Sequence, residues 1–137
     1  MIPLSFDAWR SGKELEFKND YDKFQSTGDV KYLVKFKDIS REGFHYFLRE
    51  AWNIFEQSNM RGKKAFVVER FRRIKTHGKL AYPVTIGQAE VRISYYIVTP
   101  LNRWWFGESC AIIPLEDTPQ LVVALEKVRE CPSRLIV

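Results

Sequence analysis

The sequence predicts an α+β domain: a mostly antiparallel sheet of about four to five strands with two helices packed on one face. Residues 29–37 and 64–75 alternate between apolar and polar side chains, the period of a half-buried strand. Residues 41–57 and the segment after Asp117 instead repeat apolar side chains at helical spacing. The later strands are joined by short connections, which favour antiparallel pairing. A chain of 137 residues suits one domain over residues 1–137.

The N-terminal 28 residues carry the weakest pattern. Residues 13–18 alternate and predict a short strand, followed by turns at residues 19–20 and 26–28. Residues 29–37 predict a strand whose second face is basic through its lysines. Ser40 is a suitable N-cap, with Glu42 in the first turn, for a helix over residues 41–57.

The second half predicts strands and a final helix. Residues 64–75 form a long strand, and residues 76–79 are typical of a hairpin loop. Residues 80–86 are the expected return strand, which Pro83 confines to an edge or a bulge. Strands over 90–98 and 104–113 follow, joined by a turn at 100–102. Asp117 or Thr118 caps the last helix, with Pro119 at its first position and Pro132 at its end.

Charge is distributed unevenly along the chain. The formal net charge is +5, and aromatic residues make up 15% of the sequence. Residues 61–103 contain ten basic and two acidic residues and so carry +8, while the remainder carries −3. This asymmetry favours a polyanionic partner.

Several classes of protein do not fit the composition. No run of about eighteen apolar residues predicts a membrane span, and we expect no membrane partner. The first residues do not resemble a signal peptide. Two cysteines, Cys110 and Cys131, are too few for a disulfide scaffold or a four-ligand zinc site. These features lead us to expect a cytoplasmic protein.

The more polar side of each strand combines basic and aromatic side chains, as a single-stranded nucleic acid requires. Unstacked bases gain about 1–3 kcal/mol each on aromatic rings while Lys and Arg follow the phosphates. We expect Tyr96, Trp105 and Trp104 to stack bases. The expected phosphate contacts are Lys35, Lys37, Arg70, Arg72, Arg73, Arg92 and Arg103.

Other functions remain open. The same aromatic face could be a protein interface, where Trp, Tyr and Arg are also enriched, and a homodimer is one form of it. A metal-dependent nuclease has weak support from Asp7 and from Glu16 with Lys18. Glu42 and His45 have the spacing of a metal-ligand pair on a helix but lack further ligands. No phosphate-binding loop or nucleophile motif is present, so we expect no cofactor and lean against an enzyme.

Three segments near the C-terminus resemble one known family. They are residues 93–98 (Ile-Ser-Tyr-Tyr-Ile-Val), 103–108 (Arg-Trp-Trp-Phe-Gly-Glu) and 113–117 (Ile-Pro-Leu-Glu-Asp). This pattern, in about the last third of the chain, resembles the ThermoDBP-like single-stranded DNA-binding proteins. The resemblance implies an α+β domain with a basic-flanked hydrophobic cleft that holds bases without sequence preference. The positions nearest that cleft would be Tyr95, Tyr96, Trp104, Trp105 and Phe106.

One feature departs from that family. Its founding members resemble a domain extended by a long C-terminal dimerising helix, whereas the last helix predicted here has about twelve residues. The sequence also leaves DNA and RNA undistinguished, because recognition of the 2′-OH depends on one or two polar contacts.

Overall fold

The computed structural model describes residues 4–132, which form one five-stranded antiparallel sheet and two α-helices. In chain order these are α1 (Phe6–Thr27), β1 (Val34–Lys37), β2 (Phe44–Glu56), β3 (Lys64–His77), β4 (Ala89–Val98), β5 (Trp104–Pro114) and α2 (Thr118–Glu130). Short 3₁₀ turns at Val30–Tyr32 and Leu115–Asp117 precede β1 and α2. The strands lie in sequence order across the sheet, so each pairs with its neighbours in the chain.

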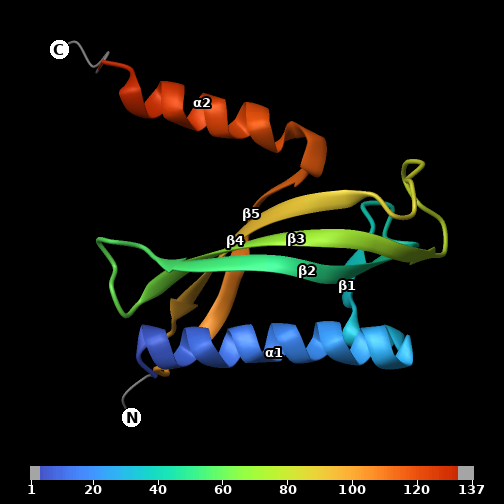
Figure 1. Ribbon diagram of the computed structural model, residues 1–137, viewed down its shortest axis with the longest axis horizontal. Helices are drawn as coiled ribbons and strands as arrows, with labels where there is room; N and C mark the ends of the chain where they lie inside the picture. Colours follow the sequence, from blue (N-terminus) through green and yellow to red (C-terminus); the bar gives the residue numbers. More distant parts are fainter. Residues whose placement is uncertain (1–3, 133–137) are drawn as a thin grey trace.

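The α+β class and the antiparallel sheet are therefore confirmed, but the two helices do not share a face. α1 lies below the sheet and α2 above it in Figure 1. We call the side that α1 covers the inner face and the opposite side the outer face. In β3 the two faces alternate residue by residue: Val67 packs in the core against α1, while Val68 lines a groove beside α2.

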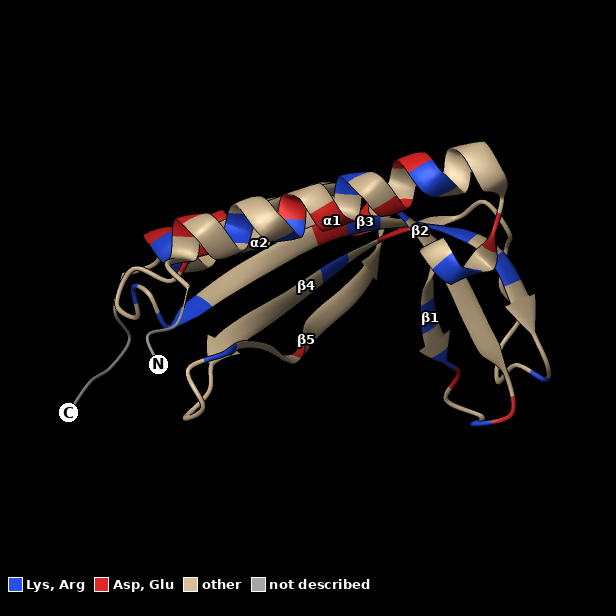
Figure 2. Cartoon of the chain, turned by 90° about the horizontal axis from the view of Figure 1, so that it is seen from below, with Lys and Arg blue, Asp and Glu red and all other residues tan. Residues whose placement is uncertain are grey.

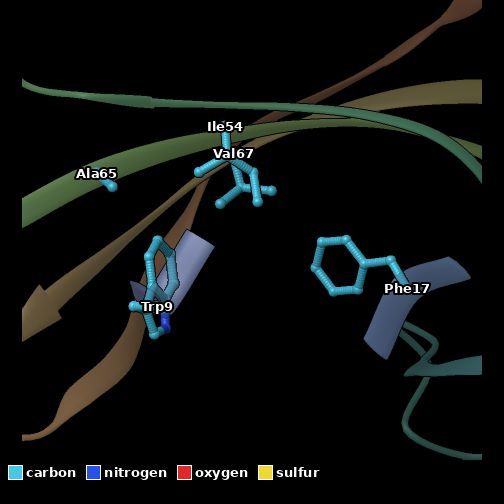
Figure 3. Packing of buried hydrophobic residues seen from close by; sticks show 5 residues of the cluster. All are labelled: Trp9, Phe17, Ile54, Ala65 and Val67. Atoms are coloured by element: carbon cyan, nitrogen blue, oxygen red, sulfur yellow. The ribbon is translucent and has the colours of Figure 1, made fainter. Parts of the chain in front are cut away.

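The core forms where α1 crosses the inner face. Trp9 and Phe17 of α1 point toward Ile54, Ala65 and Val67 of the sheet (Figure 3). Ser5 caps the helix by accepting a hydrogen bond from the Ala8 amide at 3.2 Å, and Gly28 ends it in the left-handed conformation.

The prediction of a strand at residues 13–18 was wrong. Leu15 and Phe17 would share one face of a strand, but Leu15 is exposed while Phe17 is buried. The residues that α1 turns toward the sheet are instead Phe6, Trp9 and Phe17.

The largest error concerns residues 41–57, most of which form strand β2 rather than a helix. Two register shifts, between Tyr46 and Phe47 and between Arg49 and Ala51, interrupt the pairing with β3. The first shift leaves Ile74 of β3 without a partner, and the second inserts Glu50 into β2, where it resets the alternation of that strand. Aromatic residues also favour strands over helices.

Two further boundaries differ from the prediction. β1 begins only at Val34, because residues 30–32 form a 3₁₀ turn capped by Asp29. Residues 80–86 form no strand and belong to the long connection between β3 and β4. Among residues 4–132, neither helix has the length and apolar composition that a membrane crossing requires.

The sheet is curled toward its inner face. The guanidinium carbon of Arg92, on β4, lies 5.2 Å from the Phe36 ring centroid on β1 and 5.3 Å from that of Phe106 on β5. In a flat sheet β1 and β4 would stand about 14 Å apart at the usual strand spacing. Arg92 therefore contacts rings from both edge strands, and Figure 2 shows β1 and β5 bent to the same side of the sheet.

Candidate nucleic-acid interface

Aromatic side chains cross the outer face from β2 to β5. Phe55 pairs with Phe66, and Phe66 in turn pairs with Tyr95, so three neighbouring strands present these rings directly opposite one another. The Phe55 and Phe66 centroids are 5.4 Å apart. On β5 alternation places Trp105 on the same face. Phe55 is 49% exposed and Trp105 64% exposed. We call Phe55, Phe66, Tyr95 and Trp105 the aromatic row.

A glycine makes room for the third ring of this row. The Tyr95 ring lies over Gly107 of β5 so closely that a Cβ at Gly107 would overlap the ring atoms. The β4–β5 register shifts at this point, between Tyr95 and Tyr96. A bulge with a glycine is the usual device for close approach between a side chain and a neighbouring backbone.

Basic residues surround the aromatic row. The Lys64 ammonium lies 4.6 Å from the Tyr95 centroid and 5.4 Å from that of Phe66. Arg61 and Lys63 are exposed in the turn between β2 and β3, and Arg103 is exposed in the turn before β5. This end of the outer face thus combines open aromatic rings with cations.

The predicted arginines of β3 lie further along the same face, where they are already paired. Arg70 and Arg72 both donate to the Glu50 carboxylate, at 3.1 and 2.8 Å. Hydrogen bonding to Glu50 raises the pKa of Arg72 above its ordinary value. Arg72 also donates to the Gly87 carbonyl at 2.9 Å. One carboxylate therefore offsets part of their charge.

Lys35 and Lys37 are exposed at the opposite end of the outer face, near the start of β2. The Lys35 ammonium lies 4.0 Å from the Phe44 centroid. Since Phe44 and Phe55 are eleven residues apart on one strand, at most about 36 Å separates this end from the aromatic row. Each end of the outer face therefore has its own group of basic and aromatic side chains.

Two of the predicted aromatic contacts belong to the core instead. Trp104 stacks on Trp9 of α1 with centroids 4.6 Å apart, and its indole N–H donates to the Leu4 carbonyl at 2.9 Å. Tyr96 lies 5.1 Å from the same Trp9 ring. Burial raises the pKa of Tyr96 above its ordinary value. Both side chains anchor α1 rather than an external ligand.

Three other predicted residues also lie on the inner face. Arg92 is 6% exposed and donates to Glu69 at 2.9 Å, while Arg73 is 5% exposed and donates to Glu90 at 2.5 Å. Phe106 packs edge-on against Tyr96. The twelve residues predicted from sequence thus divide between the faces. Seven are on the outer face or its turns: Lys35, Lys37, Arg70, Arg72, Tyr95, Arg103 and Trp105. Five are on the inner face, where Phe106 is still 37% exposed: Arg73, Arg92, Tyr96, Trp104 and Phe106.

A chain of hydrogen bonds crosses the inner face beyond α1. His45 Nε2 lies 2.6 Å from Asp38 Oδ1, and its Nδ1 contacts an Arg73 Nη atom. Because Arg73 can only donate, Nδ1 accepts and the His45 proton resides on Nε2. The His45 hydrogen bond, followed by backbone amides of Ser40 and Ala81, holds the pKa of Asp38 well below its ordinary value.

The alternative metal sites do not assemble. His45 lies on strand β2 and pairs with Asp38, so the helical Glu42–His45 spacing does not exist. Asp7 and Glu16 are nine positions apart on α1, about 13 Å along its axis. Within residues 4–132, no three His, Cys, Asp or Glu side chains group closely enough to hold a metal ion.

The helix α2 has no buried residue along its length, Thr118–Glu130. Its apolar residues Val122, Leu125 and Val128 are 57%, 58% and 78% exposed. Between α2 and the outer face lies an apolar groove of about 500 Å³ whose sheet wall includes Val68 and Ile93. The middle of the outer face is therefore left open on the side of α2.

Sequence reasoning missed three members of this interface. Phe55 falls in the helix predicted over residues 41–57, and in a helix Ile54 and Phe55 would not have been assigned to opposite faces of a sheet. Phe66 and Lys64 fall in a correctly predicted strand, but the sequence did not show that their side chains are on its exposed side. The usable signal was Phe66, Val68, Arg70 and Arg72 on one face of the strand over residues 64–75.

Comparisons with protein-family models, with curated proteins and with solved structures find no match for this chain. The arrangement of its residues is therefore the basis for inferring a function.

Proposed function

We propose that the protein binds single-stranded nucleic acid, without catalysis, on the aromatic row of its outer face. One observation carries the proposal: Phe55, Phe66 and Tyr95 stand side by side on three adjacent strands, with the Lys64 ammonium over two of the rings. Exposed rings on an antiparallel sheet are a surface on which successive unstacked bases can lie. Each base that stacks contributes about 1–3 kcal/mol.

The surrounding charge supports the same proposal. Lys64, Lys63, Arg61 and Arg103 are exposed or half-buried, and none makes an ion pair with another described residue. Such cations are free to neutralise phosphates, which releases the counterions condensed on the nucleic acid. A duplex would gain less, because its bases offer no free ring faces to Phe55 or Trp105.

The first test is fluorescence anisotropy of a labelled strand of about 20 nucleotides at low and moderate salt, with matched duplex as competitor. We expect salt-sensitive binding that duplex displaces poorly. Absence of binding at low salt, or equal competition by duplex, would remove the proposal.

Variants separate stacking from charge. Phe55→Ala and Trp105→Ala should each weaken binding about five-fold or more with little change in salt slope. Lys64→Ala should reduce the slope of log affinity against log salt concentration by about one. Matched controls are Tyr82→Ala, a 70% exposed aromatic in another loop, and Lys18→Ala, an exposed lysine of α1. If the controls weaken binding equally, the interface lies elsewhere.

The exposed apolar side chains of α2 favour a second candidate, a protein-interaction module that includes self-association. Val122, Val123, Leu125 and Val128 are each more than half exposed. A mass that rises with concentration, together with no nucleic-acid affinity, would favour this alternative.

The compartment we propose is the reducing cytoplasm. Cys110 and Cys131 are both free and exposed. Thiols in this state suit a compartment that keeps cysteines reduced.

A further inference from the structure

We propose that a cavity on the inner face, separate from the aromatic row, binds a small uncharged aromatic molecule that carries one N–H or O–H donor. The cavity has a volume of about 330 Å³ and lies where α1 does not cover the sheet. This volume is at the lower end of the range for small-molecule sites, about 300–1,000 Å³. The inference stands independently of nucleic-acid binding.

Three phenylalanine rings form the apolar wall. Phe36 meets Phe47 and Phe71 edge-on, with centroids 5.5 and 5.7 Å apart, and Phe47 lies 5.9 Å from Phe71. All three residues line the cavity. A planar aromatic guest can extend the same edge-to-face packing, a geometry that other apolar molecules cannot reproduce.

The buried charged groups around the cavity are already paired with one another. Asp38 accepts from His45 through one oxygen and from the Ser40 and Ala81 amides through the other. Arg73 uses its two terminal nitrogens on His45 and Glu90, while its Nε atom is buried without a hydrogen-bond partner. A charged ligand would therefore lose its hydration without gaining a free buried counter-ion.

Lys37 also lines the cavity, but it does not alter this conclusion. It is exposed to solvent, so an ion pair with a ligand carboxylate there would contribute little. The cavity accordingly favours neutral molecules.

Among the described residues that line the cavity, Lys37 and Tyr82 carry exposed polar groups, and the largely buried group that can still accept a hydrogen bond belongs to Glu90. Its side chain is only 17% exposed. Its Oε1 atom accepts from Arg73, which leaves Oε2 able to accept a second hydrogen bond. A ligand N–H or O–H that donates to this carboxylate would form a charge-assisted bond, stronger than one between neutral groups.

The loop between β3 and β4 closes the cavity on one side. At its start the Ala81 amide donates a hydrogen bond to the Asp38 carboxylate at 2.7 Å. At its end the Gly87 amide donates one to the Arg73 carbonyl at 2.7 Å. Between these anchors, Val84 lines the cavity while Ile86, two residues on and 55% exposed, does not. These two positions give a matched pair for substitution.

The test uses indole, and N-methylindole as the same ring system without its donor. Each is titrated into ¹⁵N-labelled protein and followed by amide chemical shifts. We expect indole to shift the amides of residues 38, 45, 84 and 90, and N-methylindole to bind at least three-fold more weakly. Val84→Trp, which fills the cavity, should weaken indole at least ten-fold, whereas Ile86→Trp should leave its affinity unchanged.

Three results would overturn the proposal. They are no shift up to millimolar indole, equal affinity of indole for the Val84→Trp and unsubstituted proteins, and shifts centred on the α2 groove. If Val84→Trp fails to give a folded spectrum, the comparison of indole with N-methylindole on the unsubstituted protein decides. Equal affinity for the two would then exclude the assigned hydrogen bond to Glu90.

Discussion

At the scale of single residues, the unusual feature is the amount of charge inside a small sheet. Glu69 is 1% exposed and bridges two arginines, with Arg49 at 2.5 Å and Arg92 at 2.9 Å. The Arg49 guanidinium also lies 3.8 Å from the Phe17 centroid of α1. Buried ion pairs contribute little net stability, yet losing one partner is costly because the other charges remain in the interior. Through Arg49, Glu69 thus connects the sheet to α1.

Glu69→Gln should lower the free energy of unfolding by about 3–5 kcal/mol, since it leaves two guanidiniums without a counter-ion. Urea denaturation measures this. Glu50→Gln is the matched control, because Glu50 also holds two arginines but these are 43% and 36% exposed. Its cost should be about 1 kcal/mol or less. Equal losses for both variants would contradict a special role for burial.

Asp38 should make stability depend on acid pH. Its pKa is lowered in the folded state by the His45 hydrogen bond and the backbone amides. The stabilisation is therefore complete above the unfolded pKa of about 3.9 and declines as the pH falls below it toward the folded value. Asp38→Asn should reduce unfolding free energy at pH 6, and the difference from the unsubstituted protein should shrink between about pH 4 and pH 2. A constant difference over that range would show that Asp38 keeps its ordinary pKa.

At the scale of elements, one glycine in α1 and one in β5 differ in the space around them. Gly12 lies inside α1 and a Cβ there would meet no atom within 4 Å, whereas Gly107 of β5 lies under the Tyr95 ring. The first glycine weakens its helix without a packing benefit. The second makes the aromatic row possible.

The same substitution should therefore have opposite effects at the two sites. Gly12→Ala should stabilise the protein by about 0.5–1 kcal/mol. Gly107→Ala should destabilise it and, by displacing Tyr95, weaken single-strand binding. Thermal unfolding and anisotropy measure the two effects. Unchanged binding in a folded Gly107→Ala protein would exclude Tyr95 from the interface.

At the scale of the whole molecule, stability is concentrated on the α1 side. The buried cluster joins α1 to β2 and β3, whereas α2 has no buried residue between Thr118 and Glu130. Elements with little burial open locally at low free energy. A helix of this length gains little stability from its own hydrogen bonds in water.

Amide hydrogen exchange should show this division. Residues 65–71 of β3 should exchange only with global unfolding, while residues 120–130 of α2 should exchange orders of magnitude faster. The measurement is repeated at several protein concentrations. Equal protection of α2 and β3 at every concentration would mean that α2 is packed more tightly than its exposure indicates.

The sequence alone predicted strands over 64–75, 90–98 and 104–113, which fall within β3, β4 and β5, and the final helix, because local alternation and capping specify such elements. It could not identify β2, since a bulge at Glu50 shifts its alternation, nor α1, whose inward stripe is narrow and whose surface is charged. It also could not separate Tyr95 from Tyr96 or Trp104 from Trp105. Alternation divides each pair between two faces but does not say which face is covered. That choice came only from tertiary packing: α1 covers one side, α2 stands away from the other, and five of the predicted contacts lie on the side that α1 covers.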